Sequence, residues 1–483
     1  MKLKHLSIGL KFMVAARSIL AVTGRRTLVP ALIAFYCLKS FPLFAQTAPS
    51  QTSDDTVLKQ IIIFGRHGVR SAAFPSATLA TFATRPYPDF GVPTGYLTPH
   101  GAQAEVLLGS YFRKYLLEQG LLTGNDQEDA KGSYFRANSI QRSNISAASL
   151  AAGLLPNVAV PVHSYPLGTP DPIFDPISAN VVSVDADRAV NEVKGIFNNG
   201  EALRSAYSGE LSLIRSVLFG YQNGTQPVPP TLSGLVDATA QAIPLTANTT
   251  GVATSNVINS GGVATTLYAA DPFVMEYTDG LPLTDVAWGQ LSLDTLSQQT
   301  RIINLLFDIE TLPPYLDQLQ SSNAASHVLR SMQQAVLETA LPGAFSDPAT
   351  RLLVINSSDA YVAGLAGLLH MHWLLPGYQP DYCAPGGSLV FELRQSRSSG
   401  EYLVRAFYTT QTFDQLRNLT QLTLDNPPAT MQLLIPNGSK SANNLDVKFE
   451  VFEKLLAKAI NPKYVQYPAK EISPGPLTGV PLQ

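Results

Sequence analysis

The sequence predicts an α/β fold in which helices flank a mixed central sheet and a mainly helical insertion domain interrupts the core. Two observations carry this prediction. Short apolar runs of strand length, such as 61–64 and 352–355, are each followed by a polar loop and then by residues with helical spacing. Residues 166–345 show longer helical patterns instead. We therefore assign 46–165 and 346–483 to an α/β core and 166–345 to a helical insertion.

The first part of the core should contain two strand–loop–helix units. The first strand is expected over 58–64, because Ile61-Ile62-Ile63-Phe64-Gly65 is an apolar run that is typical of a buried strand. The following helix should begin after Thr98, which can act as its N-cap, with Pro99 at the first helical position. A second strand is expected over 134–137, and a second helix over 140–153.

The insertion is expected to hold helices over 191–221 and 291–340, on either side of a flexible stretch. Residues 226–270 are rich in Thr, Ser, Ala, Gly and Pro and show no strong alternation, so no element is predicted there. The core pattern then returns, with strands over 352–355, 388–393 and 403–408 and helices over 360–369 and 447–460.

Composition excludes some classes of function. The chain has 45% hydrophobic residues, 14% charged residues and a formal net charge of −3. No long run of like charge occurs, so binding of nucleic acid through a basic face is not expected. Cys37 lies in the leader described next, so the mature chain would keep only Cys383, and no Cys/His cluster has zinc-site spacing. We therefore expect no internal disulfide, no metal and no other cofactor.

Residues 1–45 have the features of a targeting segment. A basic start is followed by the mostly apolar run 28–38, and Leu43-Phe44-Ala45 ends like a cleavage site. An uncleaved N-terminal anchor is the alternative, but the apolar run is shorter than the ~20 residues that span a bilayer. We expect a cleaved export signal, a periplasmic or secreted protein, and no stable membrane insertion of the mature chain.

The strongest candidate site is Arg66-His67-Gly68-Val69-Arg70, which follows the first predicted strand directly. In open α/β sheets, ligand sites form at such strand ends. Arginine can donate two hydrogen bonds to one phosphate, and a histidine held between arginines can attack a phosphoryl group to form a covalent intermediate. The alternative is a solvated basic loop, because short motifs often give false matches.

Two further loops can contribute to this site. Arg142 lies at the start of the second predicted helix, where backbone N–H groups and the helix dipole attract anions, although a surface arginine is the alternative. Asp359, preceded by Ser358, follows the strand 352–355 and is either a site carboxylate or the cap of the next helix. If these strand ends converge, three arginines, a histidine and a carboxylate meet in one place.

These motifs resemble those of the histidine acid phosphatases, the two-domain branch of the histidine phosphatase superfamily, and most nearly those of bacterial periplasmic phytases and glucose-1-phosphatases. The matching segments follow the family's order and cover most of residues 58–420. They include Arg66–Arg70, Leu97-Thr98-Pro99-His100-Gly101, Arg142-Ser143, Asp171–Pro176 and Pro385–Glu392. The resemblance implies a small phosphorylated substrate.

The resemblance also implies roles for the site residues. His67 would be the nucleophile and would form a phosphohistidine. Arg66, Arg70 and Arg142 would bind the phosphoryl oxygens and neutralise their charge without a metal. Asp359 would protonate the leaving oxygen, so an acidic pH optimum is expected.

Ser358 departs from the pattern, because the family typically has histidine at this position. Serine can still donate one hydrogen bond to a bound phosphoryl group, but losing one transition-state donor typically costs on the order of 10²–10³ in rate. The leading function is exported phosphomonoester hydrolysis through a phosphohistidine, acting on phytate, a sugar phosphate or another small phosphomonoester. Two alternatives are a catalytically weakened protein that binds a phosphorylated ligand, and a phosphoryl transferase or mutase.

Overall fold

The sheet is built around β1 (Thr56–Arg66), which lies between a parallel and an antiparallel neighbour. The computed structural model describes residues 54–220, 235–248, 256–439 and 444–467, and the described residues from Asp55 onward group into one compact unit. The predicted export signal at 1–45 lies outside the described residues.

Among the described residues, eight strands form one mixed sheet in the order β10-β8-β7-β1-β6-β2-β3, with β9 paired to β8. The strands other than β1 are β2 (Ser133–Ala137), β3 (Val162–His163), β6 (Leu352–Ser357), β7 (Ser388–Ser396), β8 (Tyr402–Thr410), β9 (Ala429–Gln432) and β10 (Val447–Lys448). β6, β2 and β3 run parallel to β1, whereas β7 pairs antiparallel with β1, and β8 antiparallel with β7. The prediction of an α/β fold with a mixed central sheet is therefore confirmed.

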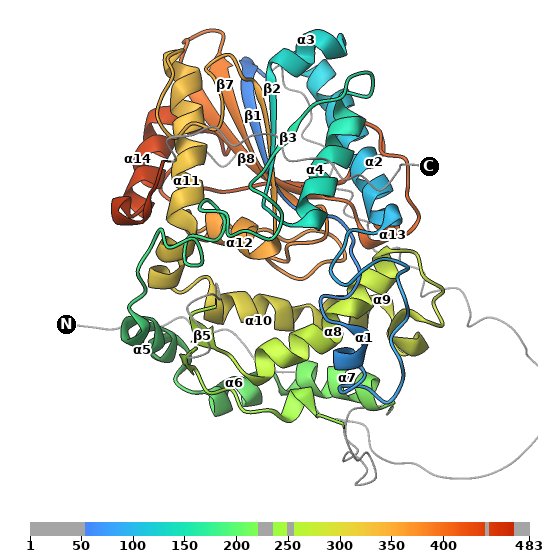
Figure 1. Cartoon of the computed structure of the whole chain (residues 1–483). Coiled ribbons are helices and arrows are strands. Elements are labelled where there is room, and N and C mark those ends of the chain that lie inside the picture. Colours follow the sequence, from blue (N-terminus) through green and yellow to red (C-terminus); the bar gives the residue numbers. More distant parts are fainter. Residues whose placement is uncertain (1–53, 221–234, 249–255, 440–443, 468–483) are drawn as a thin grey trace, which may run out of the picture. The chain divides into compact units, whose positions relative to one another are not determined.

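Alternate residues of β1 enter two different apolar clusters, one on each face of the sheet. Ile61 and Ile63 pack with residues of α2 (Pro99–Glu118) and α4 (Gln141–Leu154). Ile62 and Phe64 belong to the cluster that includes residues of the helices on the opposite face (Figure 1). Those helices are α11 (Pro314–Leu337), α12 (Asp359–Gly367) and α14 (Phe449–Ala459). Burial on both faces explains why positions 61–64 of this strand are all apolar.

Two glycines bring α2 and α4 into backbone contact. A Cβ atom at Gly109 would lie 2.1 Å from the Leu150 carbonyl oxygen, and one at Gly153 would lie 2.1 Å from the Val106 carbonyl oxygen. As predicted, α2 begins after Thr98, whose side chain accepts a hydrogen bond from the Gly101 N–H. The first turn of α2 lies against the loop that follows β1, since a Cβ atom at Gly101 would lie 2.2 Å from the Val69 carbonyl oxygen, and α4 contacts the same loop through Ser146.

The segment between β3 and β6 supplies a layer of helices beyond the end of the sheet (Figure 1). These are α5 (Ala186–Phe197), α6 (Gly200–Ala206), α7 (Ser208–Phe219), α8 (Gly262–Thr278), α9 (Leu293–Gln299) and α10 (Arg301–Glu310). The last helix of the segment, α11, packs instead against α12, α14 and β1. The division of the core at residues 165 and 345 stays a prediction.

Two long predicted helices are broken into shorter ones. The pattern over 191–221 becomes α5, α6 and α7, because Asn198 adopts a positive φ and Asn199 starts a new helix as its N-cap. The pattern over 291–340 becomes α9, α10 and α11, which are interrupted at Thr300 and at Pro313. α8 has no predicted counterpart, and Pro272 lies inside it.

Short elements complete the described part of the chain: α1 (Ser76–Leu79), α3 (Asp126–Lys131), α13 (Phe413–Arg417), β4 (Thr246–Ala247), β5 (Ile258–Asn259), and single 3₁₀ turns at Ala238–Ala240, Val286–Gly289 and Pro462–Tyr464. No helix within the described residues is both long enough and apolar enough to span a bilayer.

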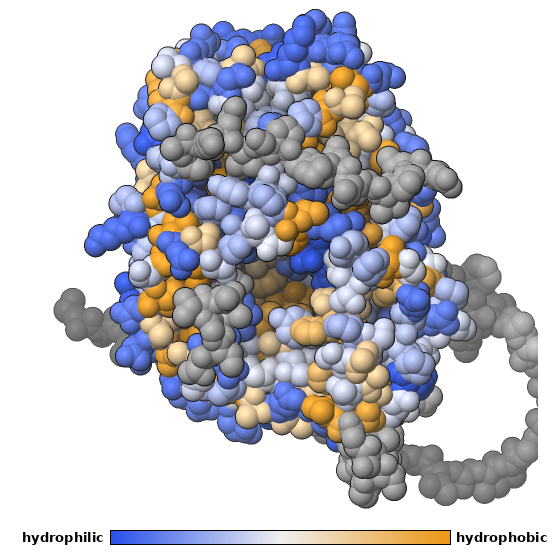
Figure 2. Space-filling view, viewed as in Figure 1, coloured by the Kyte–Doolittle hydropathy of each residue, from blue (hydrophilic) through white to orange (hydrophobic). Residues whose placement is uncertain are grey.

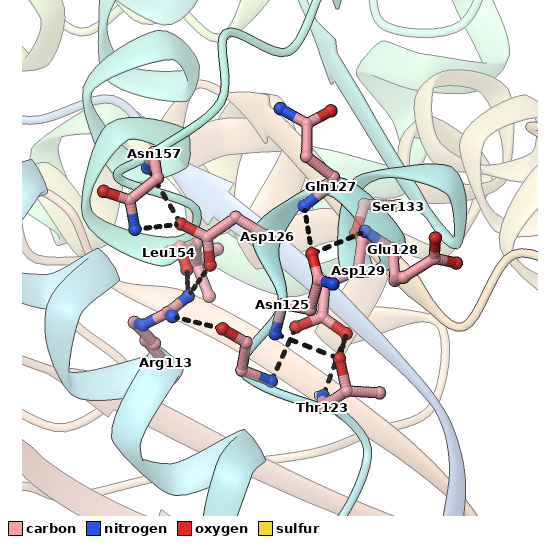
Figure 3. Close-up of polar contacts among 11 residues, drawn as sticks. Arg113, Thr123, Asn125, Asp126, Gln127, Glu128, Asp129, Ser133, Leu154 and Asn157 are labelled. Atoms are coloured by element: carbon pink, nitrogen blue, oxygen red, sulfur yellow. Dashed lines mark hydrogen bonds and ion pairs between the residues drawn. The ribbon is translucent and has the colours of Figure 1, made fainter.

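A polar network around α3 joins the far ends of α2 and α4 (Figure 3). The buried Asp126 carboxylate pairs with Arg113 of α2 and accepts hydrogen bonds from the backbone N–H and the side-chain amide of Asn157, each at 2.8 Å. Arg113 also donates to the Leu154 carbonyl oxygen at 2.8 Å. This network fixes the relative position of the two helices whose opposite ends reach the candidate site.

Candidate active site

The backbone of His67 is held between the ends of two strands. Its N–H donates to the Ser357 carbonyl oxygen at 2.9 Å, at the end of β6. Its carbonyl oxygen accepts from the Gly386 N–H at 3.0 Å, in the loop that leads into β7. The Gly68 N–H donates to the Ser146 hydroxyl of α4 at 2.9 Å. The motif loop is therefore anchored on three sides at the carboxyl end of β1.

His67 is 2% exposed, and its surroundings determine which ring nitrogen carries the hydrogen. Nδ1 lies 2.8 Å from the Gly68 carbonyl oxygen, and because that oxygen can only accept, Nδ1 carries the hydrogen and Nε2 keeps its lone pair. Burial, followed by the charges of Arg142, Arg66 and Arg70, holds the pKa of His67 well below its usual value. The ring is therefore neutral in mildly acidic solution, as a nucleophile must be.

Arg66 connects the end of β1 to two other loops. Its side chain is fully enclosed; Nη1 donates to the Cys383 carbonyl oxygen at 2.5 Å, and Nη2 lies 3.0 Å from Asp359 Oδ2. The predicted neighbours Arg66 and Asp359 thus meet, although they come from distant parts of the chain.

Asp359 is the first residue of α12, and its N-cap is Ser358. The interpretation of Asp359 as a helix cap is therefore wrong. Its Oδ1 accepts from the Ala360 N–H at 3.1 Å, and the side chain is 22% exposed, so solvent and ligands can reach it. Within the described residues, Ser358 makes no capping hydrogen bond with its hydroxyl.

Arg70 has a partner that the sequence did not reveal. Its Nη1 lies 2.9 Å from Oδ2 of Asp271, and both side chains are buried. Asp271 comes from α8, in a stretch that combines a Thr- and Gly-rich composition with a helical proline, so no helix was predicted there. A carboxylate among Leu267, Phe273 and other buried apolar residues is nevertheless a usable signal, because a buried charge needs a partner.

Arg142 is the second residue of α4 and completes the cluster. Burial, then the neighbouring charge of Arg70, lowers the pKa of Arg142 to about 10, while Asp359 acts in the opposite direction. Its Nη1 donates to the Gly95 carbonyl oxygen at 3.3 Å. Its Nε is buried and has no hydrogen-bond partner among the described residues. The structure thus brings all the predicted arginines to one place, around His67.

A hollow opens on the face shown in Figure 2, where the end of the sheet meets α8 and α10, and hydrophilic residues line part of its rim. Over the described ranges, no group of three or more His, Cys, Asp or Glu residues is placed to hold a metal ion. The charge at the site comes from side chains: three arginines and the carboxylates of Asp271 and Asp359.

A buried neutral histidine among arginines at a strand end defines a site for phosphoryl groups in an α/β enzyme. The comparisons with known proteins agree. Residues 57–191 match the family model described as the Histidine phosphatase superfamily (branch 2). The chain is similar to this family over these residues, and its relatives support a phosphomonoesterase of the histidine acid phosphatase type.

Similar proteins align along nearly their whole length. The phytase AppA of Escherichia coli (strain K12) is 27% identical over 406 residues, which are 82% of this chain and 90% of the relative. A glucose-1-phosphatase of Providencia rettgeri is 26% identical over 433 residues, covering 88% and 98%. The structure of a Hafnia alvei phytase in complex with tartrate superposes with a TM-score of 0.74 at 27% identity, covering 87% of this chain and all of that one.

Glu105 is a second residue that sequence reasoning missed. It lies on α2, is 2% exposed, and neither carboxyl oxygen has a hydrogen-bond partner among the described residues. A Cβ atom at Gly68 would lie 2.8 Å from its Oε1, and one at Gly386 would lie 3.0 Å from it. The Glu105 carboxyl therefore packs directly against Gly68 and Gly386, in the two loops that hold the His67 backbone. Burial raises the pKa of Glu105 to about 8.

We predict that Glu105→Gln is more stable than the wild type at neutral pH but not at pH 4. The folded protein keeps the proton of Glu105 up to about pH 8, whereas the unfolded chain releases it near pH 4.5, so the wild type loses stability across this window. Urea unfolding from pH 4 to 8.5 should show a difference that grows to a few kcal/mol. A difference that is constant with pH would contradict this account.

We also predict that Arg142→Met moves the acid limb of the pH profile upward. After burial, the charge of Arg142 is the largest influence that lowers the pKa of His67, so its loss should let the imidazole gain a proton at higher pH. The measurement is kcat/KM for p-nitrophenyl phosphate against pH, which reports groups of the free enzyme. Lys131→Met, at an exposed position on α3, is the charge-matched control. An unchanged limb would reject the coupling.

Proposed function

We propose that the protein is an exported phosphomonoester hydrolase that works through a phosphohistidine on His67. One observation carries this proposal more than any other. The Gly68 carbonyl oxygen holds the proton on Nδ1, so a neutral Nε2 is available as the nucleophile within a cluster of arginines. A phosphoryl group needs charge neutralisation and in-line positioning more than covalent help from the protein.

The proposed reaction has two steps. Nε2 of His67 attacks phosphorus, the P–O bond to the alcohol breaks, and the leaving oxygen takes the proton of the Asp359 carboxyl group. A water molecule then gives a proton back to Asp359 and attacks the phosphohistidine, which releases phosphate and the free imidazole. Arg66, Arg70 and Arg142 bind the phosphoryl oxygens throughout, and Ser358 adds one hydroxyl donor.

The names of the relatives support a small phosphorylated substrate. They are phytases and glucose-1-phosphatases, so phytate and sugar phosphates are the first substrates to test, together with other small phosphomonoesters. Ser358 favours one other candidate function, a protein that binds a phosphorylated ligand and turns it over slowly, because serine is a shorter donor than the imidazole the family typically has.

We predict that His67→Ala abolishes release of p-nitrophenol at acid pH while the protein still binds inorganic phosphate. The alanine variant loses the nucleophile and keeps the arginines. Mixing the wild type with labelled substrate and quenching in alkali should trap label that is stable to base and labile to acid, as expected for phosphohistidine. His372→Ala is the control, because that imidazole is exposed and pairs with Asp381.

Turnover that survives in His67→Ala would reject the nucleophile assignment. A wild type that binds phosphate and hydrolyses no phosphomonoester would favour the binding protein instead.

Export is the remaining part of the proposal, and it rests on the basic and apolar pattern of residues 1–45. When the full chain is expressed in a bacterial host, we expect it in the periplasm or medium, with an N-terminus just after Ala45. N-terminal sequencing of the recovered protein tests this. A chain that keeps Met1 and stays with the membrane fraction would indicate an anchor.

A further inference from the structure

One buried hydroxyl at the site lacks an acceptor for its proton. Tyr382 lies in the loop before β7, is 1% exposed, and its hydroxyl proton has no acceptor among the described residues. Leaving a buried hydroxyl unpaired costs about 1–3 kcal/mol, and buried tyrosines usually avoid that cost. The orphaned hydroxyl therefore points to a partner that the isolated chain does not supply.

The surroundings of Tyr382 make this hydroxyl unusual. Its neighbour Tyr378, whose ring centroid is 5.8 Å away, donates to the Gln411 carbonyl oxygen at 2.5 Å. Tyr408 accepts from the Ala384 N–H at 3.1 Å. The backbone of the loop is also held by a hydrogen bond, since the Trp373 indole N–H donates to the Tyr382 carbonyl oxygen at 3.1 Å. The missing partner is thus specific to one atom and does not reflect a loosely packed region.

That atom faces the charged groups of the site. The hydroxyl oxygen lies beside the Arg66 guanidinium, which acts on it by its charge and as a side-chain donor, and the charges of Asp271 and Asp359 also act on it. Because a guanidinium can only donate, the proton of the hydroxyl has no acceptor among the described residues. Arg66 in turn holds the next residue of the loop through the Cys383 carbonyl oxygen. The hydroxyl therefore lies among the side chains that surround the proposed phosphoryl position.

We propose that the Tyr382 hydroxyl donates a hydrogen bond to a non-bridging oxygen of the substrate's phosphoryl group and is a further catalytic residue of this enzyme. The inference rests on the proposed phosphatase function. It gives the orphaned hydroxyl its partner, and it adds a neutral donor in a site where Ser358 supplies only a short one.

The chemistry suits a phenol. Burial raises the pKa of Tyr382 to about 12, with Arg66 acting against the rise, so the hydroxyl keeps its proton throughout the acid and neutral range. A neutral donor adds no charge to repel the arginines, and it is already in place before the substrate arrives. The proton stays on Tyr382 during the reaction, so no proton transfer has to be balanced at this residue.

The test is Tyr382→Phe, with Tyr378→Phe as the matched control. Both variants remove one hydroxyl from a buried tyrosine in the same loop. Tyr382→Phe should lower kcat on the order of 10²-fold and should weaken inhibition by vanadate by a similar factor. Its melting temperature should stay the same or rise, because an unpaired buried hydroxyl is lost. Tyr378→Phe should keep kcat within about twofold and should be less stable, because a hydrogen bond is broken.

The outcomes separate this inference from the proposed function. If the wild type hydrolyses phosphomonoesters and Tyr382→Phe keeps its kcat and its vanadate affinity, the inference fails and the proposed function stands. If Tyr382→Phe instead loses stability and kcat together, the hydroxyl is structural and the inference also fails. If the wild type hydrolyses none, the proposed function fails, and equal phosphate affinity of wild type and Tyr382→Phe would overturn the inference separately.

Discussion

The site depends on the ion pair between the Arg66 guanidinium and the Asp359 carboxylate. Arg66 is completely enclosed and cannot lose its proton, so without Asp359 it would be an uncompensated buried charge, which typically costs 3–5 kcal/mol. The pair also joins the end of β1 to the first turn of α12, and it orients the guanidinium before any ligand binds. Asp359 keeps partial exposure, so the same carboxyl can hold Arg66 and still be reached by a leaving group.

Acid conditions fit both the site and the rest of the fold. Burial raises the pKa of several carboxyl groups besides Glu105, namely Asp175, Glu276, Asp279, Asp308, Glu310 and Asp317. Between the pKa of the unfolded chain and that of the folded protein, unfolding releases protons, so these groups stabilise the fold more as pH falls. The imidazoles of His67 and His327 work in the other direction, because unfolding lets them gain a proton in acid, and so do the carboxyl groups whose pKa is lowered, namely Asp55, Asp126 and Glu401. Two of these opposing carboxyl groups, Asp55 and Glu401, are exposed and their shifts are screened by solvent, so the buried carboxyl groups with raised pKa values favour acid.

The parts of the fold that the sequence predicted are those specified by local chemistry. The apolar run of β1, the Thr98 cap of α2 and the strand β6 each depend on residues adjacent in the chain, and each was placed within a few positions. The helices beyond the sheet were harder, because single residues such as Asn198 end them without changing the overall period. α8 was missed for the related reason that Pro272 and a Thr-rich start hide its periodicity.

The same distinction applies to the site. Arg66, His67 and Arg70 were recognisable because they lie within five consecutive positions at the end of a strand. Asp271 and Tyr382 were not, because their importance comes only from what they face across the fold. A lone aspartate or tyrosine carries no periodic or spacing signal, and only burial reveals that its polar atoms need a partner.

The charge balance of the site follows from these unpredicted partners. Arg66 and Arg70 each have a carboxylate partner, whereas Arg142 contacts a backbone carbonyl oxygen and has a buried Nε with no bond among the described residues. Of the three arginines, Arg142 thus has the most N–H donors available to an incoming anion. Arg66 and Arg70 are already held in position by their carboxylate partners. Such pre-orientation means that little rearrangement accompanies the reaction, which is how electrostatic stabilisation becomes effective in an enclosed site. In the proposed mechanism, the two carboxylates therefore serve to position Arg66 and Arg70 even though they lower the net positive charge.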